Sequence, residues 1–148
     1  MEIQKVIPTD LDTVTALVKE VSEVDVLPWF NSQGQEEYKG RVLPDLATTF
    51  DEGRFLSIKA VSDGKLLGFA ALRDGNYLTH LFVSQSSQGV GLGRELLRFL
   101  LNATEAKEVS LRSSINAVGF YERNGFMATG EEAEFNGIRF VPMTLVQS

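Results

Sequence analysis

Three glycines at alternate positions form the part of the sequence that is best suited to bind a ligand. Gly89, Gly91 and Gly93 follow a strand-like segment, residues 77–83, and lead into a segment with helical periodicity, residues 92–103. Glycine lets the backbone approach a bulky group closely and turn its N–H groups toward one point. The free N–H groups of a helix's first turn and its positive dipole end add further donors. A strand, a glycine loop and a helix N-terminus in this order predict a site for phosphate.

The residues around the glycines discriminate between kinds of phosphate loop. A P-loop requires Lys and then Ser or Thr after its last glycine, whereas Gly93 is followed by Arg94 and Glu95. A dinucleotide-binding fold requires the spacing G-x-G-x-x-G, and the spacing here is one residue shorter. A flavin- or nucleotide-binding module is therefore disfavoured. An ordinary tight turn is the remaining alternative, but three glycines so close together weaken both neighbouring elements without a compensating function.

The glycine loop resembles that of one enzyme family. Gln88, Gly91 and Gly93 fill the pattern Gln/Arg-x-x-Gly-x-Gly/Ala, which is the pyrophosphate loop of the GNAT superfamily of acyl-CoA-dependent N-acetyltransferases. The strand end at residues 81–83 lies at the family's usual distance before the loop, and an amphipathic helix follows it. The resemblance therefore extends to the elements on both sides of the glycines.

A second segment, residues 113–126, resembles the family's signature on and after the last helix. Ala117 is followed by Phe-Tyr and then by Gly-Phe, as in that signature. Ser114 stands where many members have Asn, and Asn116 is nearby but out of register. The resemblance covers most of the chain, but residues 25–53 lie outside it.

The resemblance implies acetyl-CoA as co-substrate and no metal. The pyrophosphate would lie on the loop amides, and the peptide-like pantetheine arm would pair with the strand edge like an added strand. The arginines next to the loop and on the last helix would assist with the phosphates. The expected cofactor contacts are Leu81, Phe82, Val83, Gln88, Gly89, Val90, Gly91, Leu92, Gly93, Arg94, Ser114, Asn116, Tyr121 and Arg123.

The implied reaction is direct acyl transfer, in which a neutral primary amine attacks the thioester and the thiolate leaves. One proton must leave the amine and one must reach the sulfur. Tyr121 holds the position of the family's usual acid, and its high intrinsic pKa suits donation to a thiolate. The alternative for Tyr121 is a core aromatic side chain on a helix face.

The base that takes the amine proton has several candidates. His80 titrates in a useful range, although a single histidine among apolar neighbours is also typical of a structural residue. Glu20, Glu23, Asp25 and a chain of water molecules are the alternatives. The acceptor amine stays open. A non-catalytic acyl-CoA-binding sensor of the same fold, which would keep the glycine loop without turnover, is the alternative function.

Composition narrows the class of protein. The 148 residues carry a net charge of −6, which does not favour nucleic acid or an anionic membrane as a partner. No apolar run is long enough to span a bilayer, and no apolar signal-peptide core follows Met1, so we expect a cytoplasmic monomer or homodimer. The absence of cysteine excludes disulfides, thiolate metal sites and a cysteine nucleophile, and His80 is the only histidine.

The elements that must position these residues follow from hydrophobic periodicity and turn residues. The N-terminal half predicts a strand over residues 3–7, a helix over 11–24 capped by Thr9 or Asp10, and a hairpin of 55–61 with 65–73. Residues 25–53 are the hardest part to interpret: 36–50 has helical spacing interrupted by Pro44. Trp29 and Phe30 in this part form either a pocket wall or core.

The C-terminal half predicts a helix, a parallel strand, a second helix and a terminal hairpin. A second Asp-Gly turn, at residues 74–76, precedes the strand 77–83. Alternation places Leu78, His80 and Phe82 on one face of that strand and residues 77, 79, 81 and 83 on the other. The next helix would bury Leu92, Leu96, Phe99, Leu100 and Ala103.

The remaining elements complete a mixed sheet. A strand over 107–111 would lie parallel to 77–83. A helix over 116–124 would end at Gly125, and strands 126–129 and 135–145 would pair around Asn136-Gly137 or a nearby turn. The sequence thus predicts one α/β domain, residues 1–148, with a mixed, mostly antiparallel sheet. The GNAT resemblance implies that a central parallel strand pair splays in this sheet and that helices flank it.

Overall fold

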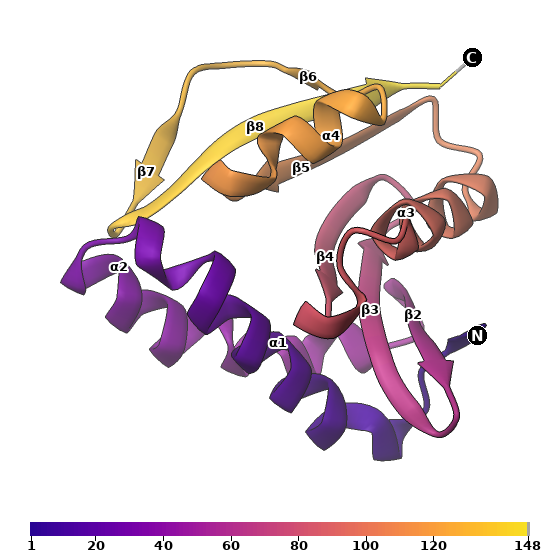
Figure 1. Cartoon of the computed structure of the whole chain (residues 1–148). Coiled ribbons are helices and arrows are strands. Elements are labelled where there is room, and N and C mark those ends of the chain that lie inside the picture. The colour runs from indigo at the N-terminus through magenta and orange to yellow at the C-terminus, as the bar shows by residue number, and fades with distance from the viewer. Residues whose placement is uncertain (148) are drawn as a thin grey trace.

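The computed structural model describes residues 1–147, which form one mixed sheet with helices on both faces (Figure 1). The strand order is β1-β2-β3-β4-β5-β8-β6, with β7 paired to β8, and every pair is antiparallel except β4–β5. This confirms the predicted mixed α/β sheet. The strands are β1 (Glu2–Lys5), β2 (Phe55–Ser62), β3 (Lys65–Arg73), β4 (Tyr77–Val83), β5 (Glu108–Ser113), β6 (Met127–Ala128), β7 (Ala133–Phe135) and β8 (Ile138–Val146).

Four α-helices and several shorter helical turns cover the sheet. The α-helices are α1 (Leu11–Asp25), α2 (Ser32–Glu37), α3 (Leu92–Ala103) and α4 (Val118–Arg123). The 3-10 turns are Pro8–Asp10, Leu27–Trp29, Pro44–Phe50, Gln85–Ser87 and Ile115–Ala117, and Tyr38–Val42 is a π-helical turn. Within residues 1–147 no helix has both the length and the apolar character needed to cross a membrane.

Two Asp-Gly turns set the register of the antiparallel half of the sheet. Asp63 and Gly64 have φ angles of 52° and 74°, and Asp74 and Gly75 have the same pair of values. Positive φ at both residues gives the twist of a two-residue hairpin between the paired Ser62 and Lys65, and Asp-Gly tolerates it well. The second turn has one residue more, because Arg73 pairs with Tyr77. The predicted hairpins β2–β3 and β3–β4 are therefore confirmed.

The only parallel strand pair of the described sheet, β4–β5, is short and then opens. The two strands pair at Tyr77 with Ser110 and at Leu78 with Leu111, whereas β4 stays paired with β3 as far as Val83. Beyond Leu78 the edge of β4 that faces β5 has no strand partner among the described residues. The predicted splay is thus present, and it begins directly after Leu78 (Figure 1).

A β-bulge at Thr79 changes the side-chain pattern of β4. Leu72 pairs with Leu78 and Ala71 pairs with His80, so Thr79 is an extra residue. An extra residue shifts the two-residue alternation. Leu78 consequently packs into the cluster beneath α3 and α4, while His80 contacts Phe69 on the face that α1 covers. The prediction that Leu78 and His80 share a face is wrong for this reason.

The core consists of one cluster on each face of the sheet and a smaller third cluster. In α3 the buried side chains are Leu92, Leu96, Leu97 and Leu100. Phe99 is 39% exposed and Ala103 is also exposed, so their predicted burial is wrong. The buried stripe of α3 therefore runs through Leu97 rather than Phe99.

Residues 25–53 change helical type rather than forming the single helix that the spacing of 36–50 suggested. The α-helical turns of α2 pass into the π turn, and Pro44 begins the following 3-10 segment. Proline suits the first position of a helical segment because its missing N–H would be unpaired there. Phe30 is 7% exposed and Trp29 is 43% exposed, so only the first belongs to the interior.

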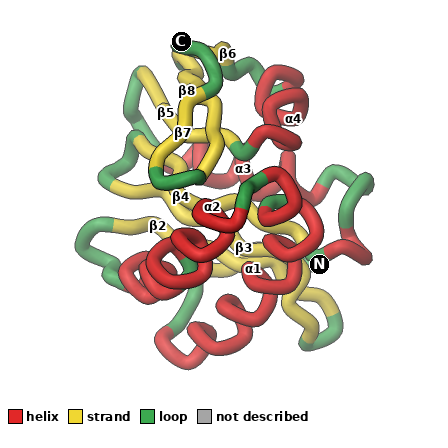
Figure 2. Tube along the Cα trace, turned by 90° about the vertical axis from the view of Figure 1, so that its left-hand side faces the viewer, coloured by secondary structure: helices red, strands yellow, loops and turns green. Residues whose placement is uncertain are grey.

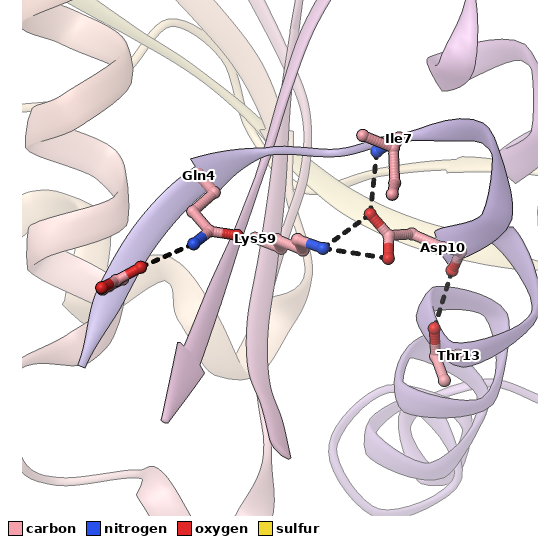
Figure 3. A network of polar contacts seen from close by, with 6 residues as sticks. Gln4, Ile7, Asp10, Thr13 and Lys59 are labelled. Carbon is pink, nitrogen blue, oxygen red and sulfur yellow. Dashed lines mark hydrogen bonds and ion pairs between the residues drawn. The ribbon is translucent and has the colours of Figure 1, made fainter. Parts of the chain in front are cut away.

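Asp10 links the segment between β1 and α1 to β2 and does not cap α1. Its carboxylate accepts hydrogen bonds from the Ile7 N–H at 2.8 Å and from Lys59 Nζ, at 3.0 Å to Oδ1 and 2.9 Å to Oδ2 (Figure 3). Burial raises the pKa of Asp10, but these hydrogen bonds and the Lys59 charge outweigh it and hold the pKa below its ordinary value. The predicted capping of α1 is wrong, since no side chain accepts from its first turn.

The C-terminal part has one strand more than predicted. The Asn136-Gly137 turn is present, with φ angles of 51° and 85°, but it joins β7 to β8. The last helix begins as a 3-10 turn at residue 115, and Gly125 follows it with a φ of 94°. Figure 2 shows the β7–β8 turn next to α2. There the backbones of Gly34 and Gly137 are so close that a Cβ on either would overlap the other.

Candidate active site

A cavity of about 680 Å³ lies where β4 and β5 separate. It extends from the glycine loop and α4 to α1, the π turn and β8. With one exception every predicted site residue lines it, namely Leu81, Phe82, Val83, Gln88, Gly89, Gly91, Leu92, Gly93, Arg94, Ser114, Asn116, Tyr121, Arg123 and His80. Val90 is the exception, and its side chain is 77% exposed. The fold thus gathers residues from distant parts of the chain around one cavity.

The glycine loop presents a run of free backbone donors. Gly89 and Gly91 have φ angles of 82° and 85°, and α3 begins directly after Gly91. The first hydrogen bond of α3 runs from the Glu95 N–H to the Gly91 carbonyl at 3.1 Å. Within the described residues, the six N–H groups of residues 89–94 donate to no protein acceptor. Six consecutive free donors at a helix N-terminus suit a pyrophosphate.

Two arginines flank these donors. Arg94 in α3 and Arg123 in α4 both line the cavity. In the described part of the chain neither has a carboxylate within ion-pair distance. Their charges add to the positive potential of the helix end, so this side of the cavity is suited to an anionic ligand.

A side-chain cluster that no local pattern indicates holds the glycine loop. The Asp25 carboxylate accepts hydrogen bonds from Gln85 Nε2 at 3.0 Å and from Gln88 Nε2 at 2.9 Å. The same Gln88 nitrogen donates to the Val83 carbonyl at 3.1 Å. Asp25 therefore holds the loop against the end of α1. Of the other acidic candidates for the base, Glu20 and Glu23 are exposed and do not line the cavity.

Tyr121 belongs to the core and to the cavity at once. Its ring makes edge contacts with Phe120, at 5.2 Å between centroids, and with Phe126, at 5.5 Å. The side chain is 8% exposed, and its hydroxyl has no hydrogen-bond partner among the described residues. Burial raises the pKa of the Tyr121 hydroxyl above its ordinary value. The hydroxyl therefore stays protonated at neutral pH and is free to donate.

His80 reaches the cavity from the opposite face of the sheet. Its ring packs at 5.9 Å from Phe69 and 6.1 Å from Phe82, and burial lowers the pKa of His80 to about 4. Its Nδ1 lies 2.8 Å from Thr79 Oγ1, and the Thr79 hydroxyl itself donates to the Ala71 carbonyl at 3.3 Å. Since that hydroxyl proton is already used, Oγ1 accepts from Nδ1–H, and Nε2 of the neutral ring is left as an acceptor.

Ser114 and Asn116 lie together at the end of β5. The Ser114 hydroxyl donates to Asn116 Oδ1 at 2.9 Å, and both residues line the cavity. The out-of-register asparagine is therefore close to the position that the family signature would give it. Within residues 1–147 no group of three or more His, Asp or Glu side chains is placed to hold a metal ion.

The wall opposite the loop contains residues that sequence reasoning missed. Phe30 lines the cavity and Trp29 does not, so the pocket-wall interpretation fits only the first. Tyr38 is buried there, and its hydroxyl lies 2.7 Å from Ser22 Oγ. The aromatic spacing around residue 30 was the one available indication of this wall. The wall also includes Val21, Val26, Leu43, Leu46, Phe135, Ile138 and Phe140.

Part of the sequence is similar to a known acetyltransferase. A 5-NmdU N-acetyltransferase from Pseudomonas phage PaMx11 is 28% identical over 87 residues, which are 53% of this chain and 62% of the phage protein. The match thus spans less than two thirds of that relative's length.

Solved structures share the fold. A GCN5-related N-acetyltransferase from Rhodopseudomonas palustris superposes with a TM-score of 0.80 at 22% identity, over 99% of this chain and 95% of the other. The PaiA N-acetyltransferase from Thermoplasma acidophilum, in complex with coenzyme A, superposes with a TM-score of 0.75 at 23% identity, over 99% and 98% of the two chains. Because the family model described as the acetyltransferase (GNAT) domain matches residues 26–147, this chain belongs to the GNAT acetyltransferase family.

Proposed function

We propose that this protein moves an acetyl group from acetyl-CoA to a primary amine by direct transfer. The observation that carries the proposal is the run of six free N–H groups, residues 89–94, in a loop of which all residues but Val90 line the cavity between β4 and β5. A pyrophosphate matches these donors in charge and in number of acceptors. The splayed edge of β4 offers backbone groups to a peptide-like arm.

Acetyl-CoA supplies the acetyl group as a thioester, whose sulfur leaves as a thiolate. In our proposal the Tyr121 hydroxyl donates a proton to that sulfur. Its position in the cavity and its free hydroxyl support this role. Because burial raises its pKa, Tyr121 remains a proton donor across the physiological pH range.

His80 Nε2 accepts a hydrogen bond from the attacking amine or from a water molecule beside it in the proposed mechanism. A pKa of about 4 keeps the ring neutral at pH 7 and leaves Nε2 available. The same low pKa makes His80 a weak base, so it orients the lone pair of an already neutral amine more than it removes a proton from an ammonium. Arg94 and Arg123 assist by neutralising phosphate charge.

Calorimetric titration with acetyl-CoA, followed by a thiol-release assay across classes of primary amine, tests the proposal. The name of the phage relative makes 5-NmdU one acceptor to include in the panel. Binding with turnover on one class supports the acetyltransferase function and identifies the acceptor. Binding without turnover on any class favours a non-catalytic acyl-CoA sensor, and no binding contradicts the proposal. Gly91→Glu should abolish acetyl-CoA binding if the loop holds the pyrophosphate. Gly40→Glu is the matched control for the added side chain and charge, since Gly40 lies outside the cavity lining.

A further inference from the structure

The charged side chains of the cavity are nearly all cationic, although the chain as a whole carries a net charge of −6. The one carboxylate of the lining, Asp25, already accepts hydrogen bonds from two glutamines. An acceptor with several ammonium groups would therefore meet the charges of five arginines and of only one carboxylate, that of Asp25. The charged residues of the lining are Asp25, Arg41, Arg94, Arg112, Arg123 and Arg139, together with His80, which is neutral at pH 7.

Four of the five arginines that line the cavity either pair with a carboxylate or lie beside the expected phosphate site. Arg94 and Arg123 flank the glycine loop, where the phosphates of acetyl-CoA would lie. Arg41 is paired with Glu37 and stacks over Phe135 at 5.1 Å. Arg139 is held by Glu132, at 2.8 and 2.9 Å, and also donates to the Trp29 carbonyl at 3.0 Å. Arg112 is the arginine that remains.

Arg112 lies on the face of the sheet opposite the glycine loop. Its neighbours in β5, Val109 and Leu111, belong to the cluster beneath α3 and α4, so alternation places Arg112 on the other face. Its guanidinium stacks over the Phe140 ring at 4.5 Å from the centroid. Among the described residues its side chain has no hydrogen bond or ion pair.

Stacking of this kind uses the face of the guanidinium and leaves its edge free. The N–H donors lie in the plane of the group, so a stacked arginine keeps the fork that binds carboxylate or phosphate in a bidentate manner. The ring of Phe140 also restrains the side chain, so less conformational entropy is lost on binding. Arg112 thus presents an exposed, stacked and unpaired guanidinium at the cavity lining, with its donors available to an oxyanion.

We infer that the acceptor amine carries an oxyanion, a carboxylate or a phosphate, which Arg112 binds while the amine points toward the gap between β4 and β5. This inference rests on the proposed acetyltransferase function. It makes Arg112 a specificity-determining residue for the acceptor, distinct from Arg94 and Arg123, which face acetyl-CoA.

The test compares primary amines in matched pairs, with acetyl-CoA saturating. The pairs are 5-aminopentanoate with pentylamine and O-phosphoethanolamine with ethanolamine, and cadaverine and spermidine represent cationic acceptors. We expect kcat/KM to be higher for the anionic member of at least one pair. In Arg112→Gln that preference should fall by at least about tenfold, since a hydrogen bond between two charged groups is lost. The pair that shows the effect distinguishes carboxylate from phosphate.

Two further variants make the result specific. Arg112→Lys keeps the charge but loses the fork, so it should restore only part of the preference. Arg73→Gln is the control, because Arg73 also stacks on an aromatic ring, that of Tyr77 at 4.8 Å, but lies outside the cavity lining. It should leave kcat/KM unchanged for every amine. In all variants the melting temperature and the calorimetric affinity for acetyl-CoA should stay close to those of the unmodified protein.

The outcomes separate this inference from the function on which it rests. The inference is overturned if only amines without an oxyanion are acetylated, or if neither anionic amine reacts. If the protein still binds acetyl-CoA in that case, the proposed cofactor site is supported all the same. An equal loss of kcat/KM on both members of a pair in Arg112→Gln also overturns it. Absence of acetyl-CoA binding in the unmodified protein would instead contradict the proposed function itself.

Discussion

The Asp25 carboxylate at the end of α1 accepts a hydrogen bond from Gln88 Nε2 at 2.9 Å, across 63 positions of sequence. Gln85 makes a second such bond, and Gln88 also reaches the Val83 carbonyl at the end of β4. Three elements that surround the cavity, α1, β4 and the glycine loop, are therefore joined at one carboxylate. The loop conformation depends on a helix whose sequence gives no indication of that role.

Asp25→Ala should destabilise the protein by removing the acceptor of both glutamine side chains. Because Asp25 is only partly buried, we expect a loss of about 1 kcal/mol in the free energy of unfolding. Urea denaturation followed by circular dichroism measures it. Glu23→Ala, an exposed change in the same helix, should cost far less, and an equal effect of the two substitutions would show that the Asp25 contacts contribute nothing.

Gly34→Ala should weaken the close contact between α2 and the β7–β8 turn. A Cβ at Gly34 would overlap the backbone carbonyl of Gly137, which cannot move without separating the two segments. We expect a loss of about 2 kcal/mol or more, as for other overpacked sites. Gly40→Ala is the matched control, since its Cβ would have no neighbour within 4 Å. Similar denaturation midpoints for the two variants would contradict the tight contact.

Gly91→Ala tests the phosphate loop through its backbone. Gly91 has a φ of 85°, and a Cβ there would meet nothing within 4 Å, so the only penalty is the left-handed conformation, about 1 kcal/mol for an L-residue. Relief of that strain would turn the loop amides away from the ligand. Calorimetry should then show acetyl-CoA binding weakened by about tenfold. Gly40→Ala should bind normally, and unchanged affinity in Gly91→Ala would argue against the proposed pyrophosphate site.

Tyr121→Phe removes the proposed proton donor and little else. We expect kcat to fall by roughly 10²-fold with the KM for acetyl-CoA unchanged, because the hydroxyl acts on the leaving sulfur. Thermal stability should change little, since that hydroxyl has no hydrogen-bond partner within residues 1–147. Tyr77→Phe is the control outside the cavity lining. Full turnover of Tyr121→Phe at neutral pH would exclude Tyr121 as the acid.

The partly buried, neutral His80 should make stability depend on pH in the acid range. Its pKa is about 4 in the folded protein and close to 6.5 in the unfolded chain. Between these values the unfolded chain binds a proton that the folded protein does not. The contribution of His80 to stability is therefore constant above about pH 6.5 and is lost as the pH drops toward 4, by on the order of 3 kcal/mol.

Urea denaturation between pH 4 and pH 7 measures this loss, and His80→Asn separates it from the titration of carboxylates. Because His80 is the only histidine, the variant should lose most of the slope between pH 5 and pH 6.5. A slope that persists in His80→Asn would assign it to other groups. Activity should show no loss from His80 protonation until well below pH 6.

The sequence was sufficient to predict those parts of the structure that depend on residues close together in the chain. The Asp-Gly pairs at 63–64 and 74–75 specify their turns because the required positive φ angles favour those residue types. The spacing of Leu92, Leu96 and Leu100 specifies the buried face of α3. The glycines of the loop, with the strand before them and the helix after them, predict the side of the cavity that β4, the loop and α3 form, but not the opposite wall.

Tertiary contacts decided the features of the structure that hydrophobic periodicity does not predict. The bulge at Thr79, which separates Leu78 from His80, is set by pairing with β3 rather than by any residue of β4. Asp25 contacts Gln88, and Arg112 stacks on Phe140. Both contacts join segments that are far apart in the sequence, so they form only in the folded chain. Side-chain pairing over such distances depends on how sheets and helices pack, whereas turns and helix faces are fixed by local backbone energetics and hydrophobic spacing.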